Sequence, residues 1–342
     1  MPLAYTINSF GVNSHKIEND EFIPLSVYSQ KDTKWNVKKN NANSLQTVFL
    51  KSEKKEIQKY AKRVSDCANG LFFNLLADSD TGEVKLKLKG ASFCHARHCP
   101  ICDWRRSLRV QAMFKNQLPE IIKENPKARW IFLTLTVENC KIEDLRETIT
   151  TMNKAFMRML KRKAFSFVKG WIKKVEVTQE KNRKEYAHPH FHVLLMVNES
   201  YFTSRAYLTK MDWVNYWSKA MKSKTQLSVD VRALRKNFNE NDIATVELLK
   251  AFNYSVKTSD ILEDSTTQKW FLEYINQVHA LKFLTSGLAL KNIFKDHKEE
   301  NENDDDLINV DDENDEGLLS SSEKDLYFFF QHTSKSYVKK RE

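Results

Sequence analysis

Four of the five cysteines fall into two groups that one bound metal ion would join. They are Cys67, Cys94, Cys99 and Cys102. The last two form a Cys-x2-Cys knuckle, and a β-rich stretch separates the first from the other three. Four thiolates in two groups suit a closed tetrahedral zinc site, which would hold both ends of this stretch together. Buried free cysteines are the alternative, and His95 or His98 could replace one sulfur. The odd number of cysteines and their clustering favour a reduced compartment over a disulfide framework.

A group of histidines opens an apolar stretch over residues 190–197. In an extended strand the side chains alternate between faces, so His190 and His192 point the same way. Phe191 and Val193 then point into the opposite layer. Two imidazoles on one face form half of a metal site, and an ordinary strand that ends in surface histidines is the alternative.

The preceding strand, residues 171–178, supplies a carboxylate. Glu176 lies between two valines, so alternation places it on the polar face, opposite His190 and His192 in a β-hairpin. Two histidines and one carboxylate leave positions open on a divalent ion, as a catalytic site requires. His188 is a weaker ligand because the proline that follows it interrupts the strand. A surface pair between Glu176 and a lysine is the alternative.

The charge of the chain is unevenly distributed. The formal net charge is +10, yet residues 299–316 carry eleven acidic side chains and no Lys or Arg. Setting these aside raises the net charge of the remaining residues from +10 to +21. Such an excess favours a polyanionic partner, because each neutralised phosphate releases counterions. Lysines that only aid solubility are the alternative. We expect the acidic run to be a solvated linker.

The chain has 342 residues and 41% hydrophobic content, enough for one large or two moderate domains. No run reaches the roughly 18 uncharged apolar residues that a membrane span needs. The first residues lack the basic start and apolar core of a secretion signal. We therefore expect a cytoplasmic protein without membrane contact.

The order of the predicted elements indicates an α+β fold. Strands are expected at 131–137, 171–178, 190–197 and 227–234, and helices at 143–163, 209–222 and 242–256. This order predicts an antiparallel-centred sheet with helices on one face, a ferredoxin-like layer, preceded by an N-terminal zinc-binding β-rich region. The expected segments are a poorly ordered segment 1–45, a helix and zinc-binding region 46–128, a catalytic domain 129–260, a helical extension 261–298, an acidic linker 299–322 and a C-terminal segment 323–342.

The last predicted helix of the catalytic domain carries a tyrosine between lysines. Helical spacing places one stripe of residues together, namely Glu247, Lys250, Tyr254 and Lys257. A tyrosine flanked by lysines is well placed to meet a phosphate, and the lysines and a nearby metal ion would help the phenol to ionise. A tyrosine at the edge of the core is the alternative.

These motifs resemble those of the HUH endonucleases, and more closely those of the rolling-circle replication initiators (Rep proteins) of small bacterial plasmids. The similar stretches are residues 93–107, 132–136, 188–194 and 254–260. They follow one another in the family's order, and the similarity extends from about residue 60 to 295.

The resemblance implies a metal-dependent, site-specific DNA endonuclease and strand transferase. A divalent ion, Mg2+ or Mn2+, held by His190 and His192, would polarise the scissile phosphate. Tyr254 would attack it, giving a 5′-phosphotyrosyl link and a free 3′-OH for a polymerase. Related initiators often carry a glutamate one turn before the tyrosine. Here Lys250 occupies that position, and Glu247 lies two turns away, so the group that activates water for the terminating cut is open.

The resemblance implies DNA as the partner, at a plasmid origin in single-stranded or cruciform form, with a host helicase and polymerase. The expected DNA contacts are Arg105, Arg106, Arg109 and Lys257. A single-strand transposase or relaxase would share the same chemistry. A zinc-containing DNA-binding regulator would bind without nicking. A non-haem iron oxygenase could use the two histidines and Glu176, but it would need neither the basic surface nor the cysteine knuckle.

Overall fold

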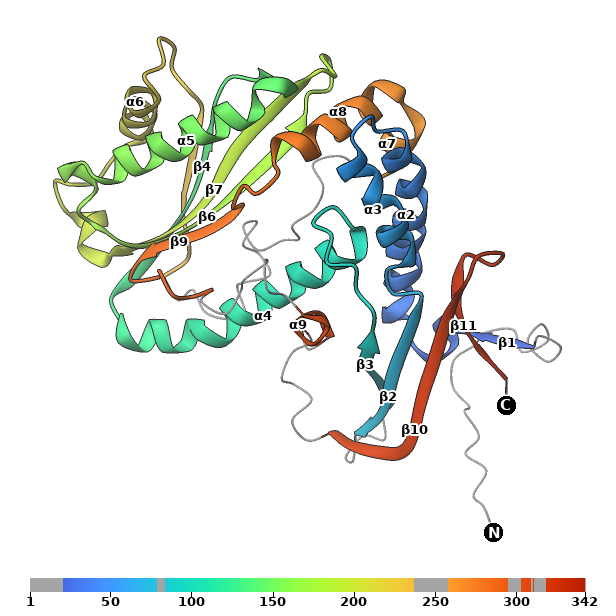
Figure 1. Ribbon diagram of the computed structural model, residues 1–342. Coiled ribbons are helices and arrows are strands. Elements are labelled where there is room, and N and C mark those ends of the chain that lie inside the picture. The colour runs from blue at the N-terminus through green and yellow to red at the C-terminus, as the bar shows by residue number, and fades with distance from the viewer. Residues whose placement is uncertain are drawn as a thin grey trace. The chain divides into compact units, whose positions relative to one another are not determined.

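The computed structural model describes residues 21–78, 84–236, 258–294, 303–308, 310 and 318–341. The chain divides into two compact units (Figure 1). The smaller unit comprises residues 1–37, 69–91 and 317–342, and the larger unit comprises residues 38–68 and 92–316. Each unit has its own antiparallel sheet.

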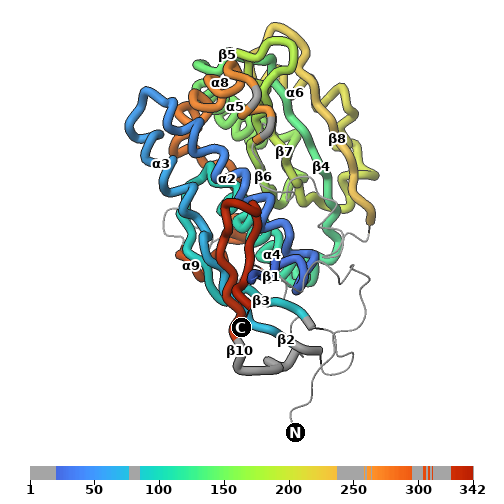
Figure 2. Tube along the Cα trace, turned by 90° about the vertical axis from the view of Figure 1, so that its right-hand side faces the viewer, coloured from blue at the N-terminus to red at the C-terminus, as the bar shows by residue number. Residues whose placement is uncertain are grey.

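The smaller unit is a five-stranded sheet in the order β1-β11-β10-β2-β3. Its strands are β1 (Phe22–Pro24), β2 (Gly70–Asp78), β3 (Val84–Ala91), β10 (Leu318–Gln331) and β11 (Ser336–Lys340). Strands from the beginning and the end of the described chain therefore lie side by side (Figure 2). One face of this sheet is buried, where Phe328 contacts the ring of Phe73 edge-on and that of Tyr28 from α1 (Leu25–Tyr28). Strand β10 begins inside the segment expected to be an acidic linker.

Helix α2 (Lys34–Leu50) lies partly in the segment expected to be poorly ordered. Its buried positions follow a helical stripe, but one of them is the fully buried Lys39. The Lys39 ammonium donates hydrogen bonds to the carbonyl oxygens of Ser65 and Cys67, at the C-terminal end of α3 (Lys55–Asp66). Because a lysine interrupts the apolar stripe and several asparagines lie nearby, the sequence pattern does not indicate a helix here.

The larger unit is centred on a six-stranded sheet in the order β8-β4-β7-β6-β9, with β5 beside one end of β7. Its strands are β4 (Ala128–Thr136), β5 (Cys140–Lys141), β6 (Val168–Gln179), β7 (Tyr186–Asn198), β8 (Val229–Ala233) and β9 (Leu284–Leu288). The chain runs from β4 through α5 (Leu145–Leu160) to the β6–β7 hairpin, then through α6 (Lys210–Met221) to β8. This β-α-β-β-α-β order and the antiparallel pairing confirm the predicted α+β sheet.

Helices cover both faces of this sheet, whereas the sequence predicts helices on one face. On one face, Phe191 of β7 contacts Phe156 of α5 and Trp217 of α6. On the other face, α4 (Pro100–Glu124) packs its apolar side chains against Phe132 and Leu194 (Figure 1). The prediction was wrong on this point because the helix before β4 was assigned to the zinc region alone. Helix α4 continues through Pro119.

The other described elements are short or lie outside the two sheets. They are α7 (Thr258–Glu263), α8 (Ser265–Gln277), α9 (Asp304–Ile308) and the short 3-10 helices η3 (Ile142–Asp144), η4 (Lys163–Phe165) and η5 (Glu199–Thr203), while η2 (Lys31–Thr33) belongs to the smaller unit. Within the described part of the chain, the helices lack the length and apolar composition that a membrane crossing requires.

Candidate metal centres

The β6–β7 hairpin brings the three predicted ligands together. In the register, Glu176 is opposite His190, and His192 is opposite both Lys174 of β6 and Thr134 of β4. Alternation along each strand places the glutamate and both histidines on the face that α4 covers farther along. The three potential ligand atoms all lie within 4.8 Å of one another. The predicted grouping is therefore present in the structure.

One carboxylate oxygen is the centre of this group, which we call the triad. Glu176 Oε2 accepts hydrogen bonds from Nε2 of His190 at 2.8 Å and from Nε2 of His192 at 2.5 Å. These two bonds hold the pKa of the Glu176 carboxyl well below its usual range, against the opposing effect of partial burial. Both histidine side chains are nearly buried, at 12% and 11% exposed, while Glu176 is 39% exposed. The two histidines thus form the buried side of the triad, and Glu176 lies on its accessible side.

The surrounding residues orient the imidazole of His192. The Thr134 hydroxyl lies 3.3 Å from Nδ1 of His192, and the Phe132 ring stacks on that imidazole with centroids 5.6 Å apart. Nδ1 of His190 is buried and has no hydrogen-bond partner among the described residues. His188 instead pairs through Nδ1 with the amide oxygen of Asn139 at 2.5 Å, outside the triad.

The triad fits a divalent cation. Two imidazole nitrogens and a carboxylate oxygen converge on one point, and this donor set suits several divalent metals while leaving coordination positions open. The Thr134 hydroxyl can accept a hydrogen bond from the protonated Nδ1 of His192, and that tautomer leaves Nε2 free to bind metal. Lys174 is a residue of this region that sequence reasoning missed. It is two residues before Glu176, so strand alternation could have placed it on the same face.

The four predicted cysteines form a second candidate centre, which we call the cysteine cluster. Their sulfur atoms lie within 4.8 Å of one another. Sγ of Cys102 is 3.6 Å from that of Cys67 and 3.7 Å from that of Cys94. A tetrahedral site with Zn–S bonds of about 2.3 Å would place sulfurs about 3.8 Å apart, so the spacing suits such an ion. His95 and His98 are not needed as ligands: His95 pairs with Asp304, and His98 packs on aromatic rings.

Local backbone geometry presents these sulfurs. Ala68 and His95, each next to a cysteine, have positive φ angles of 49° and 54°. Cys99 caps the start of α4, where Pro100 occupies the first turn. The Arg63 guanidinium donates to the carbonyl oxygen of Cys94 at 2.6 Å. Turns and a helix N-terminus therefore position the cluster.

Two of the arginines predicted to contact DNA are structural instead. Arg105 is 2% exposed and donates to the carbonyl oxygens of Leu307 and Ile308 in α9. Arg106 is 6% exposed and donates to the carbonyl oxygen of His95. Both guanidinium groups bind backbone, so their assignment as DNA contacts was wrong. Arg109 is partly buried. The other predicted residues lie outside the described part of the chain, namely Glu247, Lys250, Tyr254 and Lys257.

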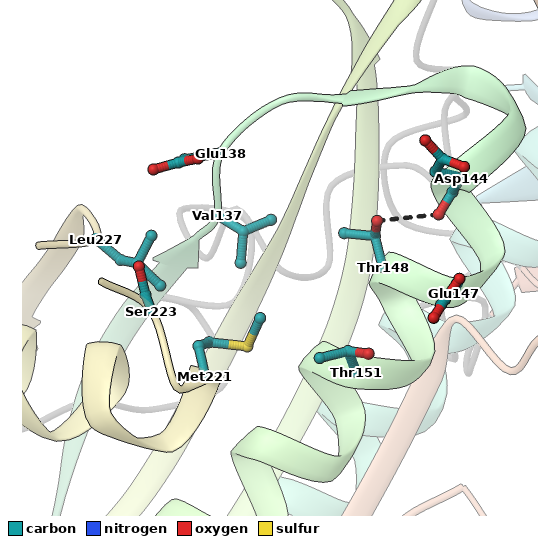
Figure 3. Close-up of a pocket in the computed structure, with 9 residues that line it drawn as sticks. All are labelled: Val137, Glu138, Asp144, Glu147, Thr148, Thr151, Met221, Ser223 and Leu227. Carbon is teal, nitrogen blue, oxygen red and sulfur yellow. Dashed lines mark hydrogen bonds between the residues drawn. The ribbon is translucent and has the colours of Figure 1, made fainter. Parts of the chain in front are cut away.

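A pocket of about 370 Å³ lies apart from both centres, between the end of β4, the first turns of α5 and the segment after α6 (Figure 3). Its described lining includes Glu138, Asp144 and Glu147 but no Lys or Arg. Three carboxylates would repel a phosphate backbone, so this pocket does not suit DNA.

Comparison with known proteins identifies relatives over most of the chain. A family described as "Replication protein" matches residues 85–338. A "Protein rep" from Bacillus amyloliquefaciens is 31% identical over 334 residues, covering 90% of this chain and 94% of its own length. A "Protein rep" from Staphylococcus aureus is 36% identical over 218 residues, covering 63% of this chain and 90% of its own length. A "Protein rep" from Streptococcus pneumoniae is 31% identical over 305 residues, covering 88% of this chain and 91% of its own length. No solved structure gave a significant match.

Proposed function

The chain belongs to the replication-protein (Rep) family of plasmids, and from this premise we propose that it nicks one DNA strand at a plasmid origin and later rejoins it. The observation that carries the proposal is the convergence of Glu176, His190 and His192 on one point. A metal-binding site on a central strand is what an enzyme of the HUH class requires. A protein that only binds origin DNA has no need for it.

The triad residues would hold Mg2+ or Mn2+ through two nitrogens and one oxygen. The cation, when bound, would draw electron density from an oxygen of the scissile phosphate. A glutamate carboxyl is already ionised over the physiological pH range, so Glu176 would offer a negative ligand without losing a proton first. Thr134 and Phe132 would keep the His192 ring in place.

Tyr254 would act as the nucleophile. Its phenolic oxygen would form a bond to phosphorus while the bond from phosphorus to the 3′ oxygen breaks. The phenol proton would leave to a base or solvent, and the departing 3′ oxygen would take up a proton. The 5′ phosphate would remain on the tyrosine, so the energy of the phosphodiester is stored and the strand can be rejoined without ATP. The free 3′-OH would prime a host polymerase, with a host helicase opening the duplex.

Three charged residues on the predicted helix stripe would assist Tyr254. Glu247 is the nearest upstream carboxylate on the predicted helix stripe, and we assign it the activation of water. Lys250 and Lys257 on the same stripe would neutralise phosphate charge near the nucleophile.

The cysteine cluster would hold a structural Zn2+. Four sulfur ligands close the coordination shell, which suits a site that stabilises a fold and not one that performs chemistry. It would fix the start of α4, whose apolar face packs on the sheet that carries the triad.

The test uses supercoiled origin plasmid and Mn2+. The wild-type protein should convert it to the open circle, and Tyr254→Phe should not. Tyr207→Phe, which changes an exposed tyrosine away from the triad, is the matched control and should nick at the wild-type rate. Nicking by Tyr254→Phe at the normal rate would refute the proposal. Specific origin binding without nicking under any divalent ion would favour the regulator instead.

A further inference from the structure

The outer face of the five-stranded sheet carries two neighbouring aromatic rings. Phe72 of β2 and Tyr327 of β10 are direct partners in the register. Their ring centroids are 4.5 Å apart, and the residues are 46% and 44% exposed. The adjacent residues Phe73 and Phe328 point to the opposite face and are buried. The core of the smaller unit therefore does not explain the exposed pair.

Each of these rings lies over a glycine, and Gly70 is the one whose lack of a side chain the ring position requires. A Cβ atom on Gly70 would come within 2.8 Å of the Tyr327 ring, and one on Gly90 would lie 3.5 Å from the Phe72 ring. Each ring thus covers a glycine of a neighbouring strand, which leaves an aromatic face toward solvent. A larger residue at Gly70 would push the tyrosine ring away from this position.

The aromatic strip extends farther along the same face. Phe329 lies two residues after Tyr327 on β10, so it points the same way. Its ring contacts that of Phe22 of β1 edge-on, with centroids 5.7 Å apart. Both Phe329 and Phe22 are partly exposed.

Lysines border the strip on the edge strand β3. Lys85 and Lys87 alternate with the buried Leu86 and Leu88, so both lie on the outer face. Lys89 also reaches this face, since its ammonium lies 2.5 Å from the carboxylate of Asp325 on β10. Lysines also protect an edge strand from pairing with other chains. That role does not explain the exposed rings beside them.

We propose that this outer face binds single-stranded DNA, with bases stacked on Phe72 and Tyr327 and phosphates near Lys85 and Lys87. Flat aromatic rings on a sheet surface next to lysines provide the two contacts that single strands use, base stacking and phosphate neutralisation. Paired bases in a duplex are already stacked on one another, so a duplex would gain only the lysine contacts. The choice of DNA over RNA rests on the proposed function, since strand nicking generates single-stranded DNA.

The test measures binding of fluorescent oligo(dT) to the full chain by anisotropy, without divalent ions. Stacking on each ring contributes about 1–3 kcal/mol, so Phe72→Ala and Tyr327→Ala should each raise the Kd about 5- to 150-fold. Tyr327→Phe keeps the ring and should bind within about twofold of wild type. Tyr207→Ala, an exposed tyrosine in the larger unit, is the control and should leave the Kd unchanged.

Two further variants separate stacking from folding. Phe72→Leu keeps an apolar side chain but removes the ring, and it should weaken binding while leaving the melting temperature unchanged. Phe72→Trp should retain binding, and its indole fluorescence should be quenched when oligo(dT) is added. Wild-type affinity in both alanine variants would overturn the proposal, as would preference for duplex DNA. Tighter binding of oligo(U) would reassign the surface to RNA. Because oligo(dT) lacks an origin and the assay needs no nicking, its outcome is independent of the Tyr254 test.

Discussion

Replacing Cys102 by serine should remove the metal from the cysteine cluster and destabilise the larger unit. Cys102 is fully buried, and its sulfur contacts those of both Cys67 and Cys94. These contacts of 3.6 and 3.7 Å are near the spacing of a tetrahedral zinc site, so the ion should bind with little rearrangement. A serine hydroxyl does not ionise as a thiol does and is a poor fourth ligand.

The expected effect is large compared with the stability of a domain. Structural zinc contributes about 10–16 kcal/mol in small zinc domains, and typical domains are stable by only about 5–15 kcal/mol. Even a loss of about 5 kcal/mol would lower the Tm by about 10–20 °C for a unit of this size. We therefore expect the variant to lose bound zinc and to melt at least 10 °C lower.

The assay combines metal analysis by mass spectrometry with thermal melting. Wild-type protein should hold one zinc ion, and EDTA should reproduce the melting behaviour of Cys102→Ser. Cys140→Ser, which changes the one cysteine outside the cluster, is the control and should keep both zinc and Tm. A Cys102→Ser protein with full zinc content and unchanged Tm would refute the reasoning, as would wild-type protein free of zinc.

Three further predictions concern the triad, a buried lysine and termination. Thr134→Val removes the hydroxyl beside His192 and should weaken Mn2+ binding about 10- to 100-fold in calorimetry, whereas unchanged affinity would exclude an orienting role. Burial lowers the pKa of Lys173 from 10.5 to about 8, so the folded state releases this proton before the unfolded chain does. The free energy of unfolding should therefore rise by up to about 3 kcal/mol between pH 8 and 10.5. Lys173→Met should remove this contribution and reduce the total rise in denaturant titrations, because the pKa values of Lys39 and Lys174 are also lowered by burial. An unchanged rise in the variant would contradict the role of Lys173. Glu247→Gln should still form the first covalent adduct but release it more slowly in single-turnover assays, and release at the wild-type rate would exclude Glu247 as the activator of water.

The sheet that carries the triad could be predicted because its signals are local. Strand alternation and the expected hairpin place Glu176 and His190 on one face, and the observed register pairs them directly. The cysteine spacing likewise identifies the members of the cluster, since four thiolates at one metal leave few other arrangements.

Other features depend on tertiary partners that the sequence does not reveal. Arg105 and Arg106 look like DNA contacts because they are charged and close to the knuckle, yet both bind backbone carbonyls inside the larger unit. Lys39 hides helix α2 because it occupies a buried position and binds carbonyl oxygens near the cysteine cluster. The exposed pair of Phe72 and Tyr327 is formed by two strands that are far apart in the sequence, so no local sequence pattern predicts it.

The central claim is that Tyr254 attacks DNA with the help of a cation held by the triad. Its most direct test is to incubate the protein with an origin oligonucleotide and Mn2+, digest it and map the adduct by mass spectrometry. We expect one nucleotide-linked peptide, modified at Tyr254, that is absent with EDTA and in His192→Ala. An adduct on another residue, or the same adduct without any divalent ion, would contradict it.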